Sequence, residues 1–332
     1  MDGILNGNIS VGGVRAYAGA TGRDLHIDVP LTNISIAYDP PALIAPLIYP
    51  IIPVEKETNV YYVWNKAEAM RVHNAVRARA TEANRINFDV SSDGYVIKNY
   101  ALAIDIPYED LENADASLSI RESAARRVIN GLNLAWEDRE AVTLTTTTNM
   151  TSSTALTNAW SDPDAGTPVE DIWNGVNAIR KASGYLPNVA IFSHPAWIAF
   201  AKHPDTIDFI RGKGDSTGGG MVTESQVMGA FGIDRVLIGK GQKVTTAEGA
   251  ATPAYTDIWT TSCILLYVNA SPGLMEPSHG YTFRWTPEGF PGPLAVERYD
   301  NRRPKTESVE VHMFQDEKTV GSDLGYLIVG CV

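Results

Sequence analysis

The chain lacks the residues on which several classes of protein depend. Its 332 residues include two cysteines, and Cys263 and Cys331 lie far apart within apolar stretches, which favours buried thiols over a disulfide or a metal pair. The apolar residues 42–54 are interrupted by three prolines, which excludes a membrane-spanning segment there, and residues 1–10 lack the basic start and apolar core of a signal peptide. We therefore expect a soluble protein that folds in the cytosol.

Basic residues are also scarce. The chain has 27 Lys and Arg against 39 Asp and Glu, and a net charge of −12 argues against a dedicated nucleic-acid binder. Residues 66–85 are an exception, since five basic and two acidic residues give a local charge of +3 and leave −15 for the rest. A basic segment on an acidic protein favours docking onto a neighbouring copy, and a solvated charged loop is the alternative. The five basic residues are Lys66, Arg71, Arg77, Arg79 and Arg85.

Motifs for catalysis and metal binding are weak. Residues 214–218 match G-x-S-x-G, the turn that exposes a nucleophilic serine in hydrolases, but Ser216 lacks the preceding strand and following helix that this turn needs. The six histidines lack metal-site spacing, and the nearest pair, His194 and His203, each precede a proline and fit helix-cap or packing roles. The lysines flanked by glycines lack the frame of a phosphate-binding loop, and the acid pairs lack the spacing of a calcium loop. We predict no cofactor, no metal site and no enzyme activity.

The clearest pattern starts at residue 86. Phe88 and Val90 alternate with polar residues, residues 91–94 have turn composition, and apolar residues recur with period two from Tyr100 to Ile106. This order predicts a β-hairpin whose second strand ends at a proline, and the whole of residues 55–105 is interpreted as a protruding arm.

A long helix is predicted next. Residues 119–122 fit a capping box, in which Ser119 and Glu122 each satisfy a backbone N–H at a helix start. Apolar residues then follow at spacings of three and four, and this spacing assigns Glu137 to another face. We expect a structural helix of about 25 residues, roughly 37 Å long.

The remaining residues divide into an irregular start and an α/β region. Residues 1–50 are rich in glycine and then proline, and their apolar residues need another surface to cover them. Strands are predicted over 281–285 and 309–313, on either side of an irregular excursion at 287–304, with a buried strand at 327–329. In the α/β region we expect helices over 168–183 and 194–202, strands over 189–193, 236–238 and 263–268, and a flexible loop over 212–220.

This order of an irregular arm, a hairpin, a long helix, an α/β region and a returning strand resembles the major capsid protein of tailed bacteriophages, the HK97-type fold, an α+β class. The resemblance covers nearly the whole chain and depends on the order of its motifs more than on any single one. The matching residues are 33–38, 43–45, 49–50, 61–64, 100–102, 107–109, 112–115 and 320–328.

The resemblance implies a division of the chain. It assigns residues 1–54 to the N-terminal arm, 55–105 to the E-loop, 106–148 to the P-domain with its spine helix, 149–279 to the A-domain, 280–315 to the P-domain strands and P-loop, and 316–332 to a C-terminal A-domain segment. It also implies pentamers and hexamers in an icosahedral shell that encloses double-stranded DNA, with E-loops overlapping adjacent subunits. The five basic residues of 66–85 would then contact the next subunit.

The resemblance further implies a virion protein that is present in the host cytoplasm before assembly, together with a portal and a possible decoration protein. A helical scaffolding segment is not recognisable in residues 1–31, so we expect a separate scaffolding protein. Lys66, Lys98 and Asn301 do not match the covalent cross-linking motif of some relatives, and we expect no cross-links. Two alternatives stay open, an encapsulin-like compartment and a serine hydrolase that uses Ser216.

Overall fold

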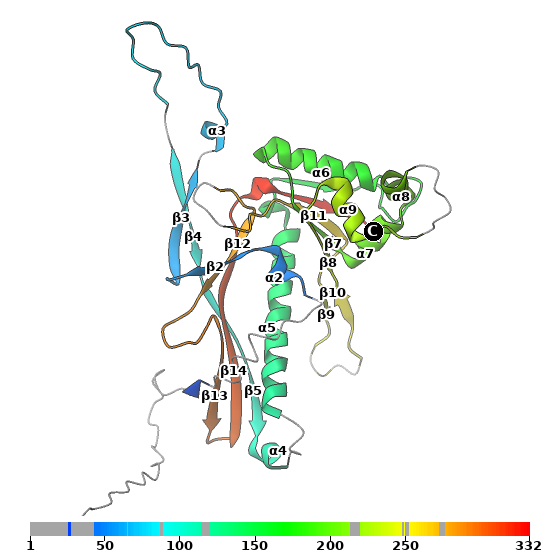
Figure 1. Ribbon diagram of the computed structural model, residues 1–332. Helices are drawn as coiled ribbons and strands as arrows, with labels where there is room; N and C mark the ends of the chain where they lie inside the picture. Colours follow the sequence, from blue (N-terminus) through cyan, green and yellow to red (C-terminus); the bar gives the residue numbers. More distant parts are fainter. Residues whose placement is uncertain are drawn as a thin grey trace, which may run out of the picture.

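The chain folds into two packed lobes and a projecting arm (Figure 1). This computed structural model describes residues 26–27, 43–64, 66–86, 89–113, 120–212, 220–247, 249, 252–271 and 276–332. Each lobe is built around one sheet, and helices and strands are mixed along the chain, so the predicted α+β class is confirmed. Most of residues 1–54, the capping residue Ser119, Ser216 and most of the loop at 212–220 lie outside the described residues.

The six-stranded lobe is organised around one long strand, β14 (Thr306–Thr319). Its first part lies between β13 and β5, and its last part pairs with β12. The sheet order is β1-β13-β14-β12-β2, with β5 paired to β14 on the side away from β13. The other strands are β1 (His26–Ile27), β2 (Ile51–Val54), β5 (Lys98–Pro107), β12 (Gly280–Trp285) and β13 (Leu294–Asn301).

The helix α5 (Ile120–Thr145) packs against both lobes, and its 26 residues agree with the predicted length. Its N-terminal half buries Val128, Ile129 and Leu132 against the six-stranded sheet, together with Val309 and Val311 of β14. Its last turns bury Ala141 and Leu144 in a second cluster with residues of the other sheet and of the short helix α2 (Ala45–Ile48). The same helix therefore supplies part of the core of both lobes.

The five-stranded lobe has the sheet order β6-β15-β11-β7-β8. Helices α6, α7 and α9 cover the face of this sheet opposite to α5. Its strands are β6 (Ser152–Ala155), β7 (Val189–Ser193), β8 (Arg235–Gly239), β11 (Ser262–Leu266) and β15 (Gly325–Val329). Its helices and the remaining short elements are α6 (Pro168–Ser183), α7 (His194–Lys202), α8 (Pro204–Arg211), α9 (Glu224–Phe231), β9 (Gln242–Val244), β10 (Tyr255–Asp257), η1 (Thr147–Asn149) and η2 (Ser322–Leu324).

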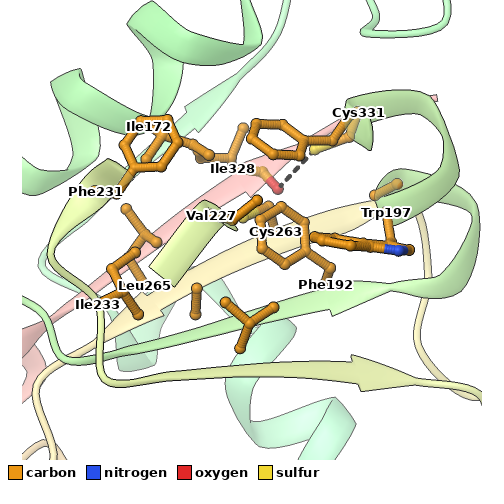
Figure 2. Packing of buried hydrophobic residues seen from close by; sticks show 14 of the residues in the cluster. Ile172, Phe192, Trp197, Val227, Phe231, Ile233, Cys263, Leu265, Ile328 and Cys331 are labelled. Atoms are coloured by element: carbon orange, nitrogen blue, oxygen red, sulfur yellow. Dashed lines mark hydrogen bonds between the residues drawn. The ribbon is translucent and has the colours of Figure 1, made fainter. Parts of the chain in front are cut away.

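The core of the five-stranded lobe consists of aromatic and aliphatic side chains from the sheet and from the helices that cover it (Figure 2). Phe192 of β7 and Phe200 of α7 are fully buried, with ring centroids 5.3 Å apart. Gly175 lets α6 approach the sheet closely, since a Cβ there would stand 2.8 Å from side-chain atoms of Leu265 and Tyr326. Cys263 is fully buried in this core, as is Cys331, and both are free thiols, as predicted.

The arm consists of the antiparallel strands β3 (Thr58–Trp64) and β4 (Val90–Val96) and the residues between them, which include the short helix α3 (Lys66–Ala69). It projects beyond both sheets (Figure 1). Only Ile97 separates β4 from β5, and the Ile97 N–H donates to Glu57 O at 2.9 Å. The chain thus passes directly from the arm into the six-stranded lobe.

Two local predictions are wrong. Residues 91–94 do not form a turn, and β4 pairs with β3 instead of with the following strand β5. Backbone pairing with β3 outweighs the turn composition, and the Asp93 carboxylate accepts a hydrogen bond from Tyr61 Oη at 2.8 Å across the ribbon.

The excursion at 287–304 is not entirely irregular either, because β13 lies within it and pairs with β14 over eight residues. This strand was not predicted because charged residues interrupt its apolar pattern. In the structure two of them, Arg298 and Glu297, make ion-pair contacts with residues of β14.

The helix α4 (Tyr108–Asn113) was not predicted, whereas several elements of the five-stranded lobe have the predicted bounds. The observed α6 runs from Pro168 to Ser183 and ends at Gly184, whose φ of 82° is the left-handed conformation that glycine adopts readily. The strand at 189–193 and the helix at 194–202 also match their predicted ranges.

Candidate interaction surfaces

The base of the arm is held by stacked aromatic rings. Tyr95 of β4 lies with its ring centroid 4.5 Å from that of Phe283 on β12, and Tyr61 of β3 stacks on the same Phe283 ring at 6.0 Å. Such pairs add about 0.5–1.5 kcal/mol each to the burial of apolar area. Lys318 Nζ also lies 3.3 Å from Asp93 Oδ2. One face of the ribbon is therefore anchored to the six-stranded lobe.

The opposite face of the ribbon is apolar, and the described part of the chain leaves it exposed. Because side chains alternate along a strand, Val60 and Tyr62 of β3 share a face with Val90 and Val96 of β4. Their exposed fractions are 64% for Val60, 67% for Tyr62, 38% for Val90 and 54% for Val96. Grouped exposed apolar side chains on one ribbon are characteristic of a surface that another protein covers.

The distal part of the arm, residues 70–86, is defined here as the tip segment. It contains exposed apolar residues as well, among which Val72 is 97% and Val76 is 81% exposed. Isolated in water, this segment gains little burial to offset the entropy of ordering it. The tip segment thus carries apolar surface that the described part of the same chain does not cover.

The structure separates the five basic residues predicted as contact residues. Arg71, Arg77 and Arg79 are exposed in the tip segment. Arg85 forms an exposed ion pair with Glu82 at 3.2 Å. Lys66 lies at the base of the tip segment, in α3, and its ammonium is 2.5 Å from Asp323 Oδ2 of the same chain. The first three are exposed and make no ion pair with the described residues, whereas Lys66 makes a contact within its own chain.

An acidic hollow lies on the five-stranded lobe between α6, α8 and the preceding loop. Its volume is about 540 Å³, and Trp173 and Phe209 form part of its apolar wall. Asp164, Glu170 and Asp205 line it, and no Lys or Arg is among the described residues of its lining. This face has the negative charge that the sequence assigns to most of the protein.

Two buried glutamates of α5 have contrasting surroundings, and the prediction that Glu137 lies on a face away from the apolar residues is wrong. The Glu137 carboxylate accepts hydrogen bonds from the N–H groups of Ile44 (2.9 Å) and Ala45 (2.6 Å) and from Trp259 Nε1 (2.6 Å). It thereby ties α2 and the five-stranded lobe to α5. Its spacing of seven from the apolar Leu144 was the sequence signal for this position.

Glu140, one turn further along α5, is also fully buried, but neither carboxyl oxygen has a hydrogen-bond partner among the described residues. Burial raises the pKa of Glu140 well above its ordinary value, and the negative charges of Glu317 and Glu137 raise it further. Burial and the neighbouring carboxylates therefore disfavour the charged form of Glu140.

Ser216, the candidate nucleophile, lies outside the described residues, and the two histidines that were weighed as metal ligands lie at the starts of helices. His203 caps α8, where its Nδ1 accepts from the Asp205 N–H at 3.1 Å, in agreement with the predicted cap role. His194 is the first residue of α7. Within the described ranges no cluster of three or more His, Cys, Asp or Glu could hold a metal ion. No helix there has the length and apolar character needed to cross a membrane.

Comparison with known proteins identifies relatives that match along most of the chain, although no family model matches it. The major capsid protein of Burkholderia phage BcepMu is 26% identical over 318 residues, which cover 92% of this chain and 96% of that protein. The major capsid protein of Pseudomonas phage JBD67 is 24% identical over 268 residues, covering 78% and 82% of the two chains. The predicted resemblance is thereby confirmed.

Solved structures give the same fold. A phage-related protein of Bordetella bronchiseptica RB50 superposes with a TM-score of 0.70 at 25% identity, covering 92% of this chain and 98% of that one. The capsid of Cyanophage P-SCSP1u has a TM-score of 0.54 at 8% identity, with 84% and 85% covered. An encapsulin of Synechococcus elongatus PCC 7942 has a TM-score of 0.51 at 15% identity, with 85% of each chain covered. The chain has the HK97-type capsid fold.

Proposed function

We propose that this protein, which has the HK97-type fold, is a major capsid protein that self-assembles into the icosahedral shell of a tailed bacteriophage. The observation that carries the proposal is a subunit with two closed cores and an arm whose apolar face and tip are uncovered. Curated relatives of nearly the same length are named major capsid protein, which supports the same function here.

The arm has apolar and positively charged surface that can contact a second copy. Covering Val60, Tyr62 and Val72 removes apolar area from water, at about 25 cal/mol per Å² buried. The free cations of Arg71, Arg77 and Arg79 add charge complementarity, since the rest of the chain is strongly acidic. A head-to-tail contact of this kind, in which unlike surfaces meet, forms rings such as pentamers and hexamers when the rotation between copies closes.

The proposed division of the chain is the one that the resemblance implies, with an N-terminal arm at 1–54, an E-loop at 55–105, a P-domain at 106–148 and 280–315, and an A-domain at 149–279 and 316–332. The observed sheets support this order in part, because α5 and three of the six strands of that lobe, β12, β13 and most of β14, fall in the P-domain segments. The strand β5 crosses the boundary, since it begins in the E-loop segment and pairs with β14.

The shell would enclose double-stranded DNA without reading its sequence. An acidic subunit with a net charge of −12 holds DNA loosely, which suits a container that is filled and emptied. We propose no enzyme activity and no cofactor. A separate scaffolding protein, a portal and a possible decoration protein are the proposed partners, with the virion as the final location and the host cytoplasm as the site of assembly.

An encapsulin-like compartment is the second candidate, because an encapsulin shares this fold. The contents of shells purified from the native host separate the two functions. Phage DNA inside the shells supports a capsid, and a packaged protein without DNA supports a compartment. Negative-stain electron microscopy of the purified protein tests both, because a protein that forms no closed shells under any assembly condition contradicts both.

The role of the tip segment is tested by a matched set of variants. Replacing residues 71–86 with a short Gly-Ser linker should leave the subunit folded and abolish shell closure. Changing Arg71, Arg77 and Arg79 together to Gln should impair closure, whereas changing the same three to Lys should retain it, since only the first set removes the charge. Normal shells from the linker variant would contradict this role.

A further inference from the structure

The contact between Lys66 and Asp323 links two distant parts of the chain. Lys66 lies in α3 at the base of the tip segment, and Asp323 lies in η2, just before β15 of the five-stranded lobe. Their side chains meet at 2.5 Å although 257 positions separate them in sequence. Through β3 and β4 the arm is joined to the six-stranded lobe, so this contact attaches it to the other lobe as well (Figure 1).

The C-terminal end of α6 forms the second part of the contact. The Lys66 ammonium also donates to the carbonyl oxygen of Ala182, the penultimate residue of α6. The last four carbonyls of a helix lack partners within the helix, and the negative end of the helix dipole attracts a cation there. Lys66 therefore satisfies two acceptors on the five-stranded lobe with one side chain.

An apolar contact lies beside the charged one. The Met70 methyl carbon packs over Gly184, where a Cβ would stand 2.9 Å away. Gly184 is also in the left-handed conformation, with φ at 82°, so another side chain at this position would be strained and would displace Met70. The Glu68 carboxylate accepts from the Asp89 N–H at 3.0 Å, which holds together the two chain segments at the base of the tip.

We propose that Lys66, Met70, Asp323, Ala182 and Gly184 form a latch that fixes the arm against the five-stranded lobe before assembly. The latch holds the tip segment in position before it binds. The tip segment therefore loses less conformational entropy when it contacts a neighbouring copy. The ion pair is partly exposed, with 45% of the Lys66 side chain and 27% of the Asp323 side chain accessible, so salt weakens it and the latch is reversible.

The effect on the unassembled subunit tests the latch directly. In hydrogen–deuterium exchange of the unassembled full-length chain, Lys66→Met and Asp323→Ala should each raise the exchange rate of residues 66–86 by about two- to five-fold, the factor expected for a partly exposed ion pair. Arg71→Met is the matched control, because it removes a cation of the same arm that lies outside the contact, and it should leave exchange unchanged. The double variant should exchange no faster than Lys66→Met alone, since the two residues share one contact.

The assembly readout rests on the proposed function, whereas the exchange readout does not. Weakening the latch should raise the subunit concentration needed for shell formation by a similar factor, and 1 M salt should reduce the difference between wild type and Lys66→Met. Unchanged exchange at residues 66–86 in both single variants, or additive effects in the double variant, would overturn the latch. Failure of wild type to form shells while the exchange result holds would count against the proposed function and leave the latch intact.

Discussion

The five-stranded lobe and the arm are made from similar apolar residues that have opposite surroundings. In the lobe, Phe192, Phe200 and Ile264 are at most 1% exposed, whereas in the arm Val72 and Val76 are more than 80% exposed. Stability of the lobe comes from its own packing, and the arm contributes little to it beyond its base. Apolar side chains on the arm are therefore better explained by contact with another molecule than by folding of this one.

The largest expected effect on stability lies within the lobe. Phe200→Ala removes a fully buried ring that contacts Phe192 and Trp160, and should lower the free energy of unfolding by about 3–5 kcal/mol. Denaturant unfolding followed by tryptophan fluorescence measures the change. Val72→Ala, the matched truncation in the arm, should change the midpoint by less than about 0.5 kcal/mol. A large loss of stability in Val72→Ala would show that the arm, like the lobe, contributes to the stability of the fold.

An intermediate effect, dependent on pH, is expected at Glu140. Because the pKa of Glu140 is raised in the folded state, the protonated fold is fully stable below the unfolded pKa and loses stability as pH rises toward the folded pKa. Glu140→Gln, which stays neutral, should therefore gain about 1–3 kcal/mol over wild type in neutral and alkaline solution, with the gain vanishing near pH 4. Thermal unfolding across pH 4–9 measures this difference.

Glu137→Gln is the control for that experiment, since it changes a buried glutamate of the same helix that has three hydrogen-bond donors. Replacing one carboxylate oxygen by an NH₂ group opposes a donor with a donor, so this variant should be destabilised. Stabilisation of both variants to the same extent would show that the difference in their hydrogen bonding has no energetic consequence.

The smallest effect on stability is expected on the outer face of the arm. Tyr62→Ser should change the free energy of unfolding by less than about 0.5 kcal/mol, because 67% of Tyr62 is exposed, yet it should reduce the yield of shells. Sedimentation separates shells from subunits, and Tyr62→Phe serves as the control that keeps the ring. If Tyr62→Ser unfolds the subunit, the outer face belongs to the fold instead of to a contact surface.

The parts that sequence predicted well are those with a complete local pattern. The helix α6 has Pro168 at its start, apolar residues at helical spacing and Gly184 after its end, so its bounds follow from nearby residues alone. The strand at 189–193 is continuously apolar because both faces of the sheet are covered. Such elements need no knowledge of distant residues.

Partners distant in sequence account for the parts that sequence did not predict. The residues of β4 have turn composition and become a strand because β3, about thirty residues earlier, pairs with them. Lys66 was assigned to the next subunit, and only the fold brings it to Asp323. The raised pKa of Glu140 comes first from burial, which depends on how the whole chain packs, and then from Glu317 on the distant strand β14.

The position of α5 has a mechanical consequence. Its residues enter the cores of both lobes, and its hydrogen bonds run along its axis for about 39 Å at 1.5 Å per residue. A force applied to one lobe is therefore carried to the other along a continuous rod instead of through a flexible linker. In the proposed capsid, internal pressure from packed DNA would therefore load each subunit as one stiff body, and deformation would concentrate at the contacts between neighbouring subunits.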